Sequence, residues 1–472
     1  MTAPKADRSA GEKQDGNDHS NSRTGCAMHP VARALMSGFG ANMAAEFRRG
    51  WPVLLMGIAG IYAMNILTYP TSILVKPIGQ EWGWSRGETT AFISFGSLVT
   101  LLVGPWAGTV VRRYGPTRTA FCGSIVMALG LVAVGHSGPH LLLWYTAWVI
   151  YAIAQQFSTV IVWSYATSIA FARSRGMALA LVMSGSAIAA ATMPGLTLWF
   201  YDRLGIAGTY SAFGAMVIVL ALPMLVLRVD GMARSPSSAR GPKEERATDT
   251  RGLTLREALR TARFWQLSIG ITLIAGIVSS VIFHAHSLMT DSGLSVTTAT
   301  WVMSLLGPSL LVGRLGTGFL LDRWSSRAVC LTVVAFPVVT CLIMATFSGS
   351  VPLAILAILC CGAAAGAEGD ILAYFASRHF GLAHYGSIYG LMLGIFSIGF
   401  GSFPPIAGFV FDRTGSYGTA FWLFSGLLAI AVVLLLKAGD YPDEFAVRPV
   451  DGEHDRKESR DDGAHTADPV RG

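Results

Sequence analysis

The sequence predicts an all-α integral membrane protein, in which twelve transmembrane helices form two six-helix bundles related by an internal repeat. Three observations lead to this prediction. The 472 residues are 52% hydrophobic and 13% charged, whereas soluble domains carry about 25% charged residues. Apolar runs of about 20 residues, long enough to cross the ~30 Å hydrocarbon core as helices, recur along the chain. The third observation is a pattern that returns at one fixed interval.

The repeat is clearest in the stretch Gly318-Phe319-Leu320-Leu321-Asp322-Arg323, which has a fainter copy 210 residues earlier (318 minus 108) at Gly108-Thr109-Val110-Val111-Arg112-Arg113. The same interval relates further pairs: Gly83 and Gly293, Ser85 and Ser295, Gly176 and Gly386, Pro194 and Pro404, Asp202 and Asp412, Arg203 and Arg413, and Gly205 and Gly415. One interval that matches at separate places is unexpected by chance, so we interpret the chain as two similar halves.

Composition divides the chain into five parts. They are a polar N-terminal tail predicted to be disordered (1–50), the first bundle (51–227), a polar linker (228–263), the second bundle (264–437) and a charged C-terminal tail predicted to be disordered (438–472). The predicted spans are 52–75, 89–111, 119–136, 141–170, 177–200, 208–227, 264–288, 299–320, 328–347, 352–377, 386–410 and 418–437. They lack the alternating pattern of β-barrel strands, so each is expected to be a helix.

Composition also excludes several classes of function. The net charge of +7 comes from basic residues that flank apolar runs and form no separate domain, so no nucleic-acid partner is expected. The six cysteines show neither metal-ligand nor disulfide spacing, and neither a metal nor a cofactor is expected. No Walker-type phosphate loop and no nucleophile–base set stand out, so the sequence favours neither an ATP-driven pump nor an enzyme.

Basic residues set the predicted orientation across the membrane. The loops after the second, fourth and eighth spans and the linker are rich in arginine, whereas the opposite loops carry only Lys76, Arg86, Arg203 and Arg413. Both tails and the linker are therefore predicted to be cytoplasmic, which an even number of crossings allows. We expect a monomeric, multi-pass protein of a bacterial inner (plasma) membrane.

The spans and loop motifs resemble those of the major facilitator superfamily, over about residues 51–437. The resemblance rests on six plus six spans, a long central linker, and a Gly-x-x-x-Asp-Arg motif after the second span of each half. It implies a transporter that opens alternately to the two sides of the membrane, gated by the motif residues Gly108, Arg112, Arg113, Gly318, Asp322 and Arg323. Arg112 stands where the family has an aspartate. In the second half, the resemblance implies that Asp322 latches the bundle to a neighbouring helix end at the inner surface.

Within the superfamily, three stretches resemble the monocarboxylate porters and oxalate/formate antiporters: Glu81–Arg86, Arg173–Gly176 and Gly313–Gly316. This resemblance implies that an arginine at the position of Arg314 holds a substrate carboxylate. The functional lysines of both families are replaced, since Thr71 follows Pro70 in the first span and Phe396 or a neighbour stands at the lysine position of the eleventh. Neither family's own substrate is therefore carried over.

Arg314 and Asp370 are charges inside predicted spans, where a charge costs about 2.5–3.5 kcal/mol and usually faces a cavity or a partner. Each lies eight residues, or about 12 Å, from the cytoplasmic end of its span, so the two share a depth and can pair. The arginine fork suits two-point binding of a carboxylate. Two roles stay open for Arg314: substrate binding or coupling, and a static bridge to an acid.

Glu368 lies two residues from Asp370 and therefore on a different face of the same helix. Asp370 shares its face with small and polar residues suited to close helix packing, whereas Glu368 shares its face with Ala364, Ile371 and Phe375. Apolar surroundings disfavour the ionised form of a carboxyl group. Two roles stay open for Glu368: a proton carrier and a neutral structural glutamic acid.

Uncharged polar residues of the first half are candidates for a substrate site near the membrane midplane: Tyr62, Asn65 and Tyr69 in the first span and Gln155 in the fourth. Hydrogen bonding between helices is the alternative role for them. His284 and His286 fall near the outer end of the seventh span, where histidines at the membrane interface are favoured over a proton relay.

The sequence therefore predicts a secondary active transporter that moves a small organic anion, a carboxylate, by proton symport or exchange, with alternating access to a midplane site. Efflux of amphipathic drug-like compounds is the alternative within transport, because the first bundle offers no cation to match Arg314. A non-transporting membrane receptor or sensor would need a folded domain in the tails or linker, which are polar. The expected partners are a small organic molecule, protons and membrane lipid.

Overall fold

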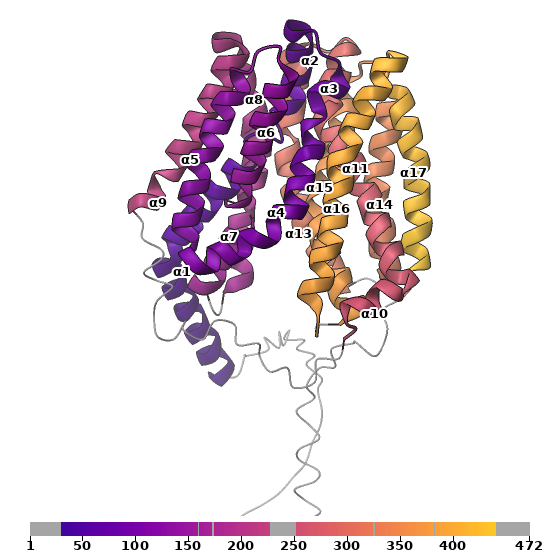
Figure 1. Cartoon of the computed structure of the whole chain (residues 1–472). Helices are drawn as coiled ribbons and strands as arrows, with labels where there is room; N and C mark the ends of the chain where they lie inside the picture. The colour runs from indigo at the N-terminus through magenta and orange to yellow at the C-terminus, as the bar shows by residue number, and fades with distance from the viewer. Residues whose placement is uncertain are drawn as a thin grey trace, which may run out of the picture. The chain divides into compact units, whose positions relative to one another are not determined.

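A computed structural model describes residues 30–158, 160–171, 174–226, 252–323, 326–381 and 383–439. The described residues from Arg49 onward belong to one compact unit, which holds both bundles. Within the described residues the regular structure is helical (Figure 1). The greater part of both predicted tails and of the linker, namely residues 1–29, 227–251 and 440–472, lies outside the described residues.

Seventeen helices follow one another along the described chain. In the first half they are α1 (Pro30–Met64), α2 (Thr71–Trp82), α3 (Arg86–Thr90), α4 (Phe92–Tyr114), α5 (Pro116–Gly135), α6 (Leu141–Gln156), α7 (Val160–Ala170), α8 (Arg175–Ala221) and α9 (Pro223–Val226). In the second half they are α10 (Leu255–Arg260), α11 (Ala262–Asp291), α12 (Val296–Ser304), α13 (Leu306–Arg323), α14 (Ser326–Ala345), α15 (Val351–Phe380), α16 (Tyr385–Thr414) and α17 (Tyr417–Lys437).

These helices account for twelve membrane crossings. Among the described residues, 8 helices are long and apolar enough to span a membrane, and the apolar part of α14, Val334–Ala345, is shorter. One of the eight, α8, has 47 residues and turns at Gly205 (φ 65°, ψ −170°), so it supplies two crossings. The last two crossings are interrupted helices, α1 with α2 and α6 with α7. The predicted fold class is confirmed.

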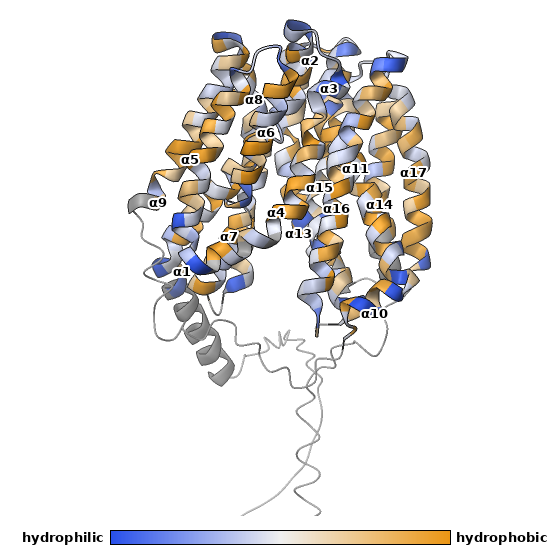
Figure 2. Cartoon of the chain, viewed as in Figure 1, coloured by the Kyte–Doolittle hydropathy of each residue, from blue (hydrophilic) through white to orange (hydrophobic). Residues whose placement is uncertain are grey.

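The two halves form separate bundles whose outer surfaces are apolar. In Figure 1 the helices α2–α9 gather on one side and α11–α17 on the other. Figure 2 shows hydrophobic residues over the flanks of the helices and hydrophilic residues concentrated at their ends. Large apolar side chains point outward, and Trp106 and Leu142 are 74% and 78% exposed. Such a surface suits contact with lipid, as expected of an integral multi-pass membrane protein.

The internal repeat extends to local backbone geometry. Gly83 and Gly293 both adopt positive φ, 74° and 96°, a conformation that favours glycine. Two residues later, Ser85 and Ser295 each begin a helix, and each hydroxyl accepts a hydrogen bond from the backbone N–H three residues on. The 210-residue interval (295 minus 85) therefore repeats the turn that leads into the second crossing of each bundle.

Some boundaries differ from the prediction. The first crossing continues beyond residue 75 to Trp82, whereas α8 turns at Gly205, between the predicted spans 177–200 and 208–227, which remain two crossings. Helix α1 begins at Pro30, inside the polar tail that is predicted to be disordered. In the first crossing and in α1 the helix extends through polar residues, which hydropathy alone assigns to loops.

Helix α10 is an element that the sequence prediction misses, because it lies in the charged linker. Thr254 and Glu257 form a capping box around its first turn. The Thr254 hydroxyl accepts from the Glu257 N–H at 3.3 Å, and the Glu257 carboxylate accepts from the Thr254 N–H at 2.8 Å. Hydrogen bonds from the Thr254 backbone and side chain hold the pKa of Glu257 below its usual value.

Candidate functional site

A cavity of about 420 Å³ lies between the two bundles. Its walls come from the first crossing, α4, α6, α7 and α8 in the first half and from α11, α13, α15 and α16 in the second. Five predicted site residues line it: Asn65, Tyr69, Gln155, Arg314 and Glu368. We call the end of the bundles near α2 and α3 the outer end, and the end near α10 the inner end, following the predicted orientation.

The first crossing is interrupted beside the cavity, between Met64 and Thr71. Asn65 begins the break, and its side-chain amide donates back to the carbonyl of Ile61 at 2.8 Å. The Gln155 amide donates to the carbonyl of Met64, also at 2.8 Å. Gln155 therefore satisfies a carbonyl at the end of α1, so the predicted alternative of helix-to-helix hydrogen bonding describes part of its role. Discontinuous helices of this kind commonly line substrate sites in secondary transporters.

Tyr62 is placed differently from the other candidates. Its hydroxyl lies 2.9 Å from the Thr192 hydroxyl and 3.2 Å from the sulfur of Met193 on α8. It is not among the residues that line the cavity. Tyr62 thus joins the first crossing to α8, because it lies on the face of α1 that packs against that helix, and we withdraw it from the substrate-binding set.

Arg314 is the only cation among the described residues that line the cavity. Its Nη1 donates to the carbonyl of Met183, across the bundle interface, at 3.3 Å. Its Nε lies 3.9 Å from Oδ2 of Asp370. The two groups therefore form an ion pair, but the distance is too long for a hydrogen bond. Nε is buried without a hydrogen-bond partner. A guanidinium has five N–H donors, so Arg314 retains unused donors beside the cavity.

Asp370 shares the depth of Arg314, as predicted, but its side chain is 46% exposed and does not line the cavity. On the same face of α15, Gly362 and Gly366 pack closely against α13. A methyl group added at Gly366 would overlap the carbonyl of Leu310. The predicted small-residue face of α15 is confirmed, and it holds the two helices at the separation that brings Arg314 and Asp370 together.

Gly366→Ala should therefore destabilise the protein. The overlap is with backbone, which cannot rotate away, so we expect a loss of about 1–3 kcal/mol, as for overpacking elsewhere. Thermal unfolding of the purified protein measures it. Gly426→Ala in α17 is the matched control, because a Cβ there meets nothing within 4 Å. An unchanged unfolding temperature for Gly366→Ala would contradict the packing described.

Glu368 has the apolar surroundings that its helical face predicts. Its side chain is 5% exposed. On one side it lines the central cavity, and on the other a small cavity of about 10 Å³ that is otherwise lined by apolar residues of α11, α14, α15 and α17. Its Oε1 has no hydrogen-bond partner. The carboxyl group therefore sits at the boundary between the central cavity and an apolar core.

The predicted gating motif is only partly described. Gly108, Arg112 and Arg113 lie in the last two turns of α4, and Gly318, Asp322 and Arg323 in those of α13, so the motif belongs to the helix ends and not to the loops in which it is predicted. The side chains of Arg112, Asp322 and Arg323 lie outside the described residues. The latch through Asp322 stays a prediction.

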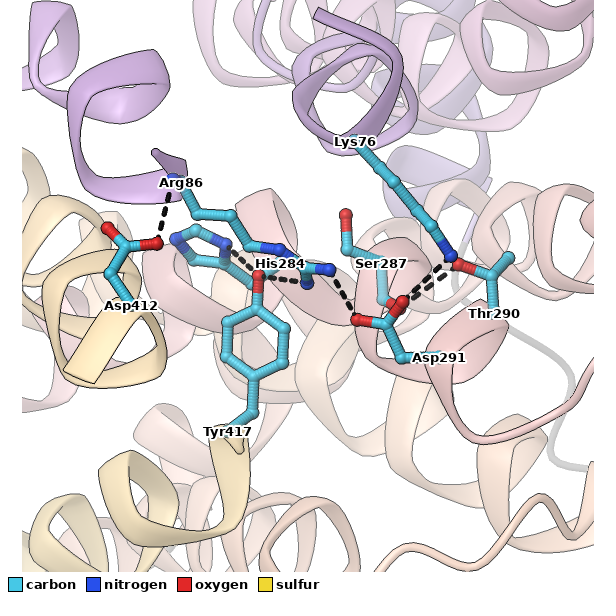
Figure 3. Close-up of polar contacts among 8 residues, drawn as sticks. All are labelled: Lys76, Arg86, His284, Ser287, Thr290, Asp291, Asp412 and Tyr417. Carbon is cyan, nitrogen blue, oxygen red and sulfur yellow. Dashed lines mark hydrogen bonds and ion pairs between the residues drawn. The ribbon is translucent and has the colours of Figure 1, made fainter. Parts of the chain in front are cut away.

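A cluster of charges at the outer end joins the two bundles. Asp291 of α11 accepts from Lys76 of α2 at 2.8 Å and pairs with Arg86 at the start of α3 at 2.6 Å (Figure 3). The Arg86 guanidinium also donates to the hydroxyl of Tyr417 at 2.8 Å. The carboxylate of Asp412 accepts from the backbone N–H of Arg86 at 2.9 Å, at a helix N-terminus, where carboxylates are favoured. We call Lys76, Arg86, Asp291, Asp412 and Tyr417 the outer latch.

The predicted interfacial position of His284 and His286 is wrong, because both side chains are buried in the packed outer end, at 0% and 4% exposure. His284 lies between the Tyr417 hydroxyl (2.9 Å) and the Pro404 carbonyl (2.8 Å). His286 contacts the hydroxyl of Thr300 at 3.1 Å. His284 therefore supports the outer latch through Tyr417.

Asp291→Asn should weaken closure of the outer end. The pairs of Asp291 are partly exposed, and pairs of this kind contribute about 0.2–1 kcal/mol each, so losing two should shift the equilibrium toward outer opening roughly two- to thirtyfold. Labelling a single cysteine introduced at the cavity residue Ser97, with an impermeant reagent added outside and the native cysteines replaced, measures the shift. Glu81→Gln, which removes an exposed outer carboxylate with no ion pair among the described residues, is the control. Equal labelling in both variants would contradict a latch.

Comparison with known proteins identifies the fold and the family. A family model described as the Major Facilitator Superfamily matches residues 54–403. An agnestins efflux protein of Paecilomyces divaricatus is 27% identical over 81% of this chain and 83% of that protein. Monocarboxylate transporter 6 of Mus musculus is 24% identical over 87% of this chain and 90% of that protein.

Two solved structures share the fold at low sequence identity. One is a bacterial homolog of the human lysosomal transporter Spinster, in an inward-facing and occupied conformation, with TM-score 0.60 and 15% identity over 82% of this chain and 95% of that chain. The other is the nucleoside transporter NupG, with TM-score 0.68 and 13% identity over 82% of this chain and 99% of that chain.

Proposed function

Since the chain belongs to the Major Facilitator Superfamily and is a membrane transporter of that family, we propose that it moves a small organic anion, a carboxylate, by secondary active transport. One observation carries this proposal: a single arginine, Arg314, stands beside the cavity between the bundles with hydrogen-bond donors unused. A guanidinium with unused donors inside a membrane protein is costly unless an anion completes its hydrogen bonding. A carboxylate fits its planar fork at two points.

The static-bridge role of Arg314 is the less favoured alternative. At 3.9 Å, Arg314 and Asp370 attract one another without sharing a hydrogen bond, and Asp370 is half-exposed. A purely structural bridge would gain most from short, two-point contact. We infer that Asp370 neutralises Arg314 when the site is empty and yields to a substrate carboxylate when it is filled.

We further propose that Glu368 couples transport to protons. An ionised carboxylate without a partner is strongly disfavoured in such apolar surroundings. The protonated form of Glu368 is therefore favoured while the side chain is enclosed. It also faces the central cavity, where a change of access would expose it to water. A glutamic acid in that position can load a proton in one state and release it in the other. Exchange of one anion for another, without protons, is the remaining mode.

The two bundles are proposed to rock about the central cavity and to expose it alternately. The outer latch joins the bundles in the arrangement described, so the outer end is closed here. Following the arginine-rich loops, we place both termini in the cytoplasm and the protein, as a monomer, in a plasma membrane. The efflux protein and the monocarboxylate transporter that match this chain in sequence are fungal and mammalian, so the proposal does not include the bacterial inner membrane expected from the sequence.

Efflux of amphipathic compounds is the second candidate, and two observations favour it. A relative carries the name of an efflux protein, and aromatic side chains line much of the cavity. Efflux differs from uptake in the direction of transport. It differs from the anion proposal in the charge of the substrate, which would be an uncharged amphipathic compound.

The proposal is tested by transport into proteoliposomes that contain the purified protein. A panel of carboxylates, each paired with its uncharged amide, is supplied with and without an inward proton gradient. We expect time-dependent, protein-dependent uptake of at least one acid, acceleration by the gradient, and no uptake of the paired amides. Equal uptake of acids and amides would overturn the anion assignment, and uptake that ignores the gradient would assign exchange in place of proton symport.

A further inference from the structure

The cavity has chemically different ends. Its charged groups, Arg314 and Glu368, come from α13 and α15 and lie at about the depth of Phe396, whereas Phe92, Trp148 and Phe283 line the opposite end. Phe92 lies six residues after the first residue of α3, Trp148 seven after the first of α6, and Phe283 eight before the last of α11. At 1.5 Å per residue these rings lie roughly 9–12 Å below the outer helix ends.

Arg314 lies deeper. It is eighteen residues from Val296, the first residue of α12, or roughly 27 Å along the crossing from the outer end. Its α-carbon is therefore about 15 Å further inward than the aromatic group, and the side chain of a helical residue leans back toward the helix N-terminus, here outward. A molecule that reaches from the guanidinium to the aromatic rings must be extended, with its charge at the inner end.

The aromatic end is preformed. The rings of Phe92 and Trp148 stack at a centroid distance of 3.7 Å and an interplanar angle of 13°. Tyr151 and Trp144 both meet Trp148 edge-on, at ring-centroid distances of 5.4 Å and 5.7 Å. Phe400 of α16 lies fourteen residues before Thr414, or roughly 21 Å below the outer end, so it faces the cavity between the two ends and meets Phe283 edge-on at 6.1 Å. Fixed rings of this kind bind another flat ring without first having to be ordered.

The volume and the charge of the cavity limit the class of ligand further. Propionate, a three-carbon acid, has five non-hydrogen atoms and, at no more than about 30 Å³ for each, would leave more than half of the 420 Å³ cavity unfilled. Cavities above about 300 Å³ suit larger ligands. Arg314 is the only cation among the described lining residues, so a second carboxylate would have no partner.

We propose that the substrate is an amphipathic monocarboxylate with an aromatic ring, held by its carboxylate at Arg314 and by its ring against Trp148, Phe92 and Phe400. This inference rests on the proposed function, because it takes the carboxylate site at Arg314 as its starting point. It excludes short aliphatic acids and dicarboxylates as preferred substrates.

The test is calorimetric titration of the purified, detergent-solubilised protein with three probes: 3-phenylpropionate, propionate and 3-phenylpropionamide. We expect 3-phenylpropionate to bind roughly ten- to a hundredfold more tightly than propionate, because burial of a ring contributes that much. Trp148→Leu and Phe400→Leu should each lower the ratio of the affinity for 3-phenylpropionate to the affinity for propionate. The ratio within one variant does not depend on the folded fraction. Trp422→Leu, which truncates an outward-facing ring that is 54% exposed, should leave the ratio unchanged.

The outcomes separate this inference from the proposed function. If propionate binds as tightly as 3-phenylpropionate and both are lost in Arg314→Gln, the aromatic inference is overturned and the carboxylate site stands. If the amide binds as tightly as its acid, the carboxylate site itself is overturned. A ratio that stays the same in Trp148→Leu and Phe400→Leu overturns the placement of the ring.

Discussion

Arg314→Lys is expected to leave the protein folded in the membrane and to remove most of its transport activity. Lysine keeps the positive charge but replaces a planar fork with a point charge, so two-point binding of a carboxylate is lost. Hydrogen bonds to charged groups contribute about 1.5–3 kcal/mol, which corresponds to a roughly ten- to hundredfold loss of apparent affinity. Initial rates of uptake at equal protein content in proteoliposomes measure the effect.

Arg203→Lys is the matched control for this substitution. Arg203 lies over the ring of Trp199 at 4.3 Å and bonds to the Trp199 carbonyl at the outer end, away from the cavity residues. Its variant should transport at the wild-type rate. Wild-type kinetics for Arg314→Lys with every transported carboxylate would show that the arginine fork does not bind the substrate.

Glu368→Gln is expected to abolish transport driven by a pH gradient and to preserve exchange of substrate across a membrane without a gradient. Glutamine has the shape of the protonated acid but cannot release a proton, so only steps that need proton release should stop. Parallel assays of gradient-driven uptake and of counterflow on the same preparation measure the two activities. Glu81→Gln, at an exposed outer carboxylate outside the cavity lining, should leave both unchanged.

Each role of Glu368 predicts a different pair of results. A neutral structural glutamic acid predicts that glutamine is nearly silent in both assays. A direct part in holding the anion predicts the loss of both activities. Intact gradient-driven uptake in Glu368→Gln would remove this residue from proton coupling.

The fold could be predicted from the sequence because membrane spans are set by local composition. Apolar runs of the right length identify most crossings without any knowledge of their packing. The repeat was equally accessible, since Gly83 and Gly293 mark turns that need positive φ and Ser85 and Ser295 mark helix starts. Helix α10 could not be found by hydropathy, because a capping box in a charged linker decides its start.

Part of the candidate site was predictable from helical periodicity. A two-residue step along one helix places Glu368 and Asp370 on different faces, and the structure places one against an apolar core and the other beside Arg314. Equal distances from helix ends predict the shared depth of Arg314 and Asp370. Asn65, Tyr69 and Gln155 line the cavity because polar residues in apolar spans turn inward.

The outer latch and the role of Tyr62 could not be predicted. Arg86 meets Asp291 and Asp412 across more than 200 residues of chain, and no local pattern specifies such a pairing. The sequence signal was present but weak: Lys76 and Arg86 are rare basic residues in outer loops. Tyr62 is one turn from the break in its helix, and only the packing of α1 on α8 decides that it contacts Thr192.

The central claim, that a substrate carboxylate is bound by Arg314 in the cavity between the bundles, is tested most directly by an experimental structure of the protein with a transported carboxylate bound. The account predicts both carboxylate oxygens within about 3 Å of the Arg314 guanidinium, which is hydrogen-bonding distance, with Asp370 no closer to that guanidinium than the ligand. A carboxylate bound elsewhere, with Arg314 still paired to Asp370, would contradict it.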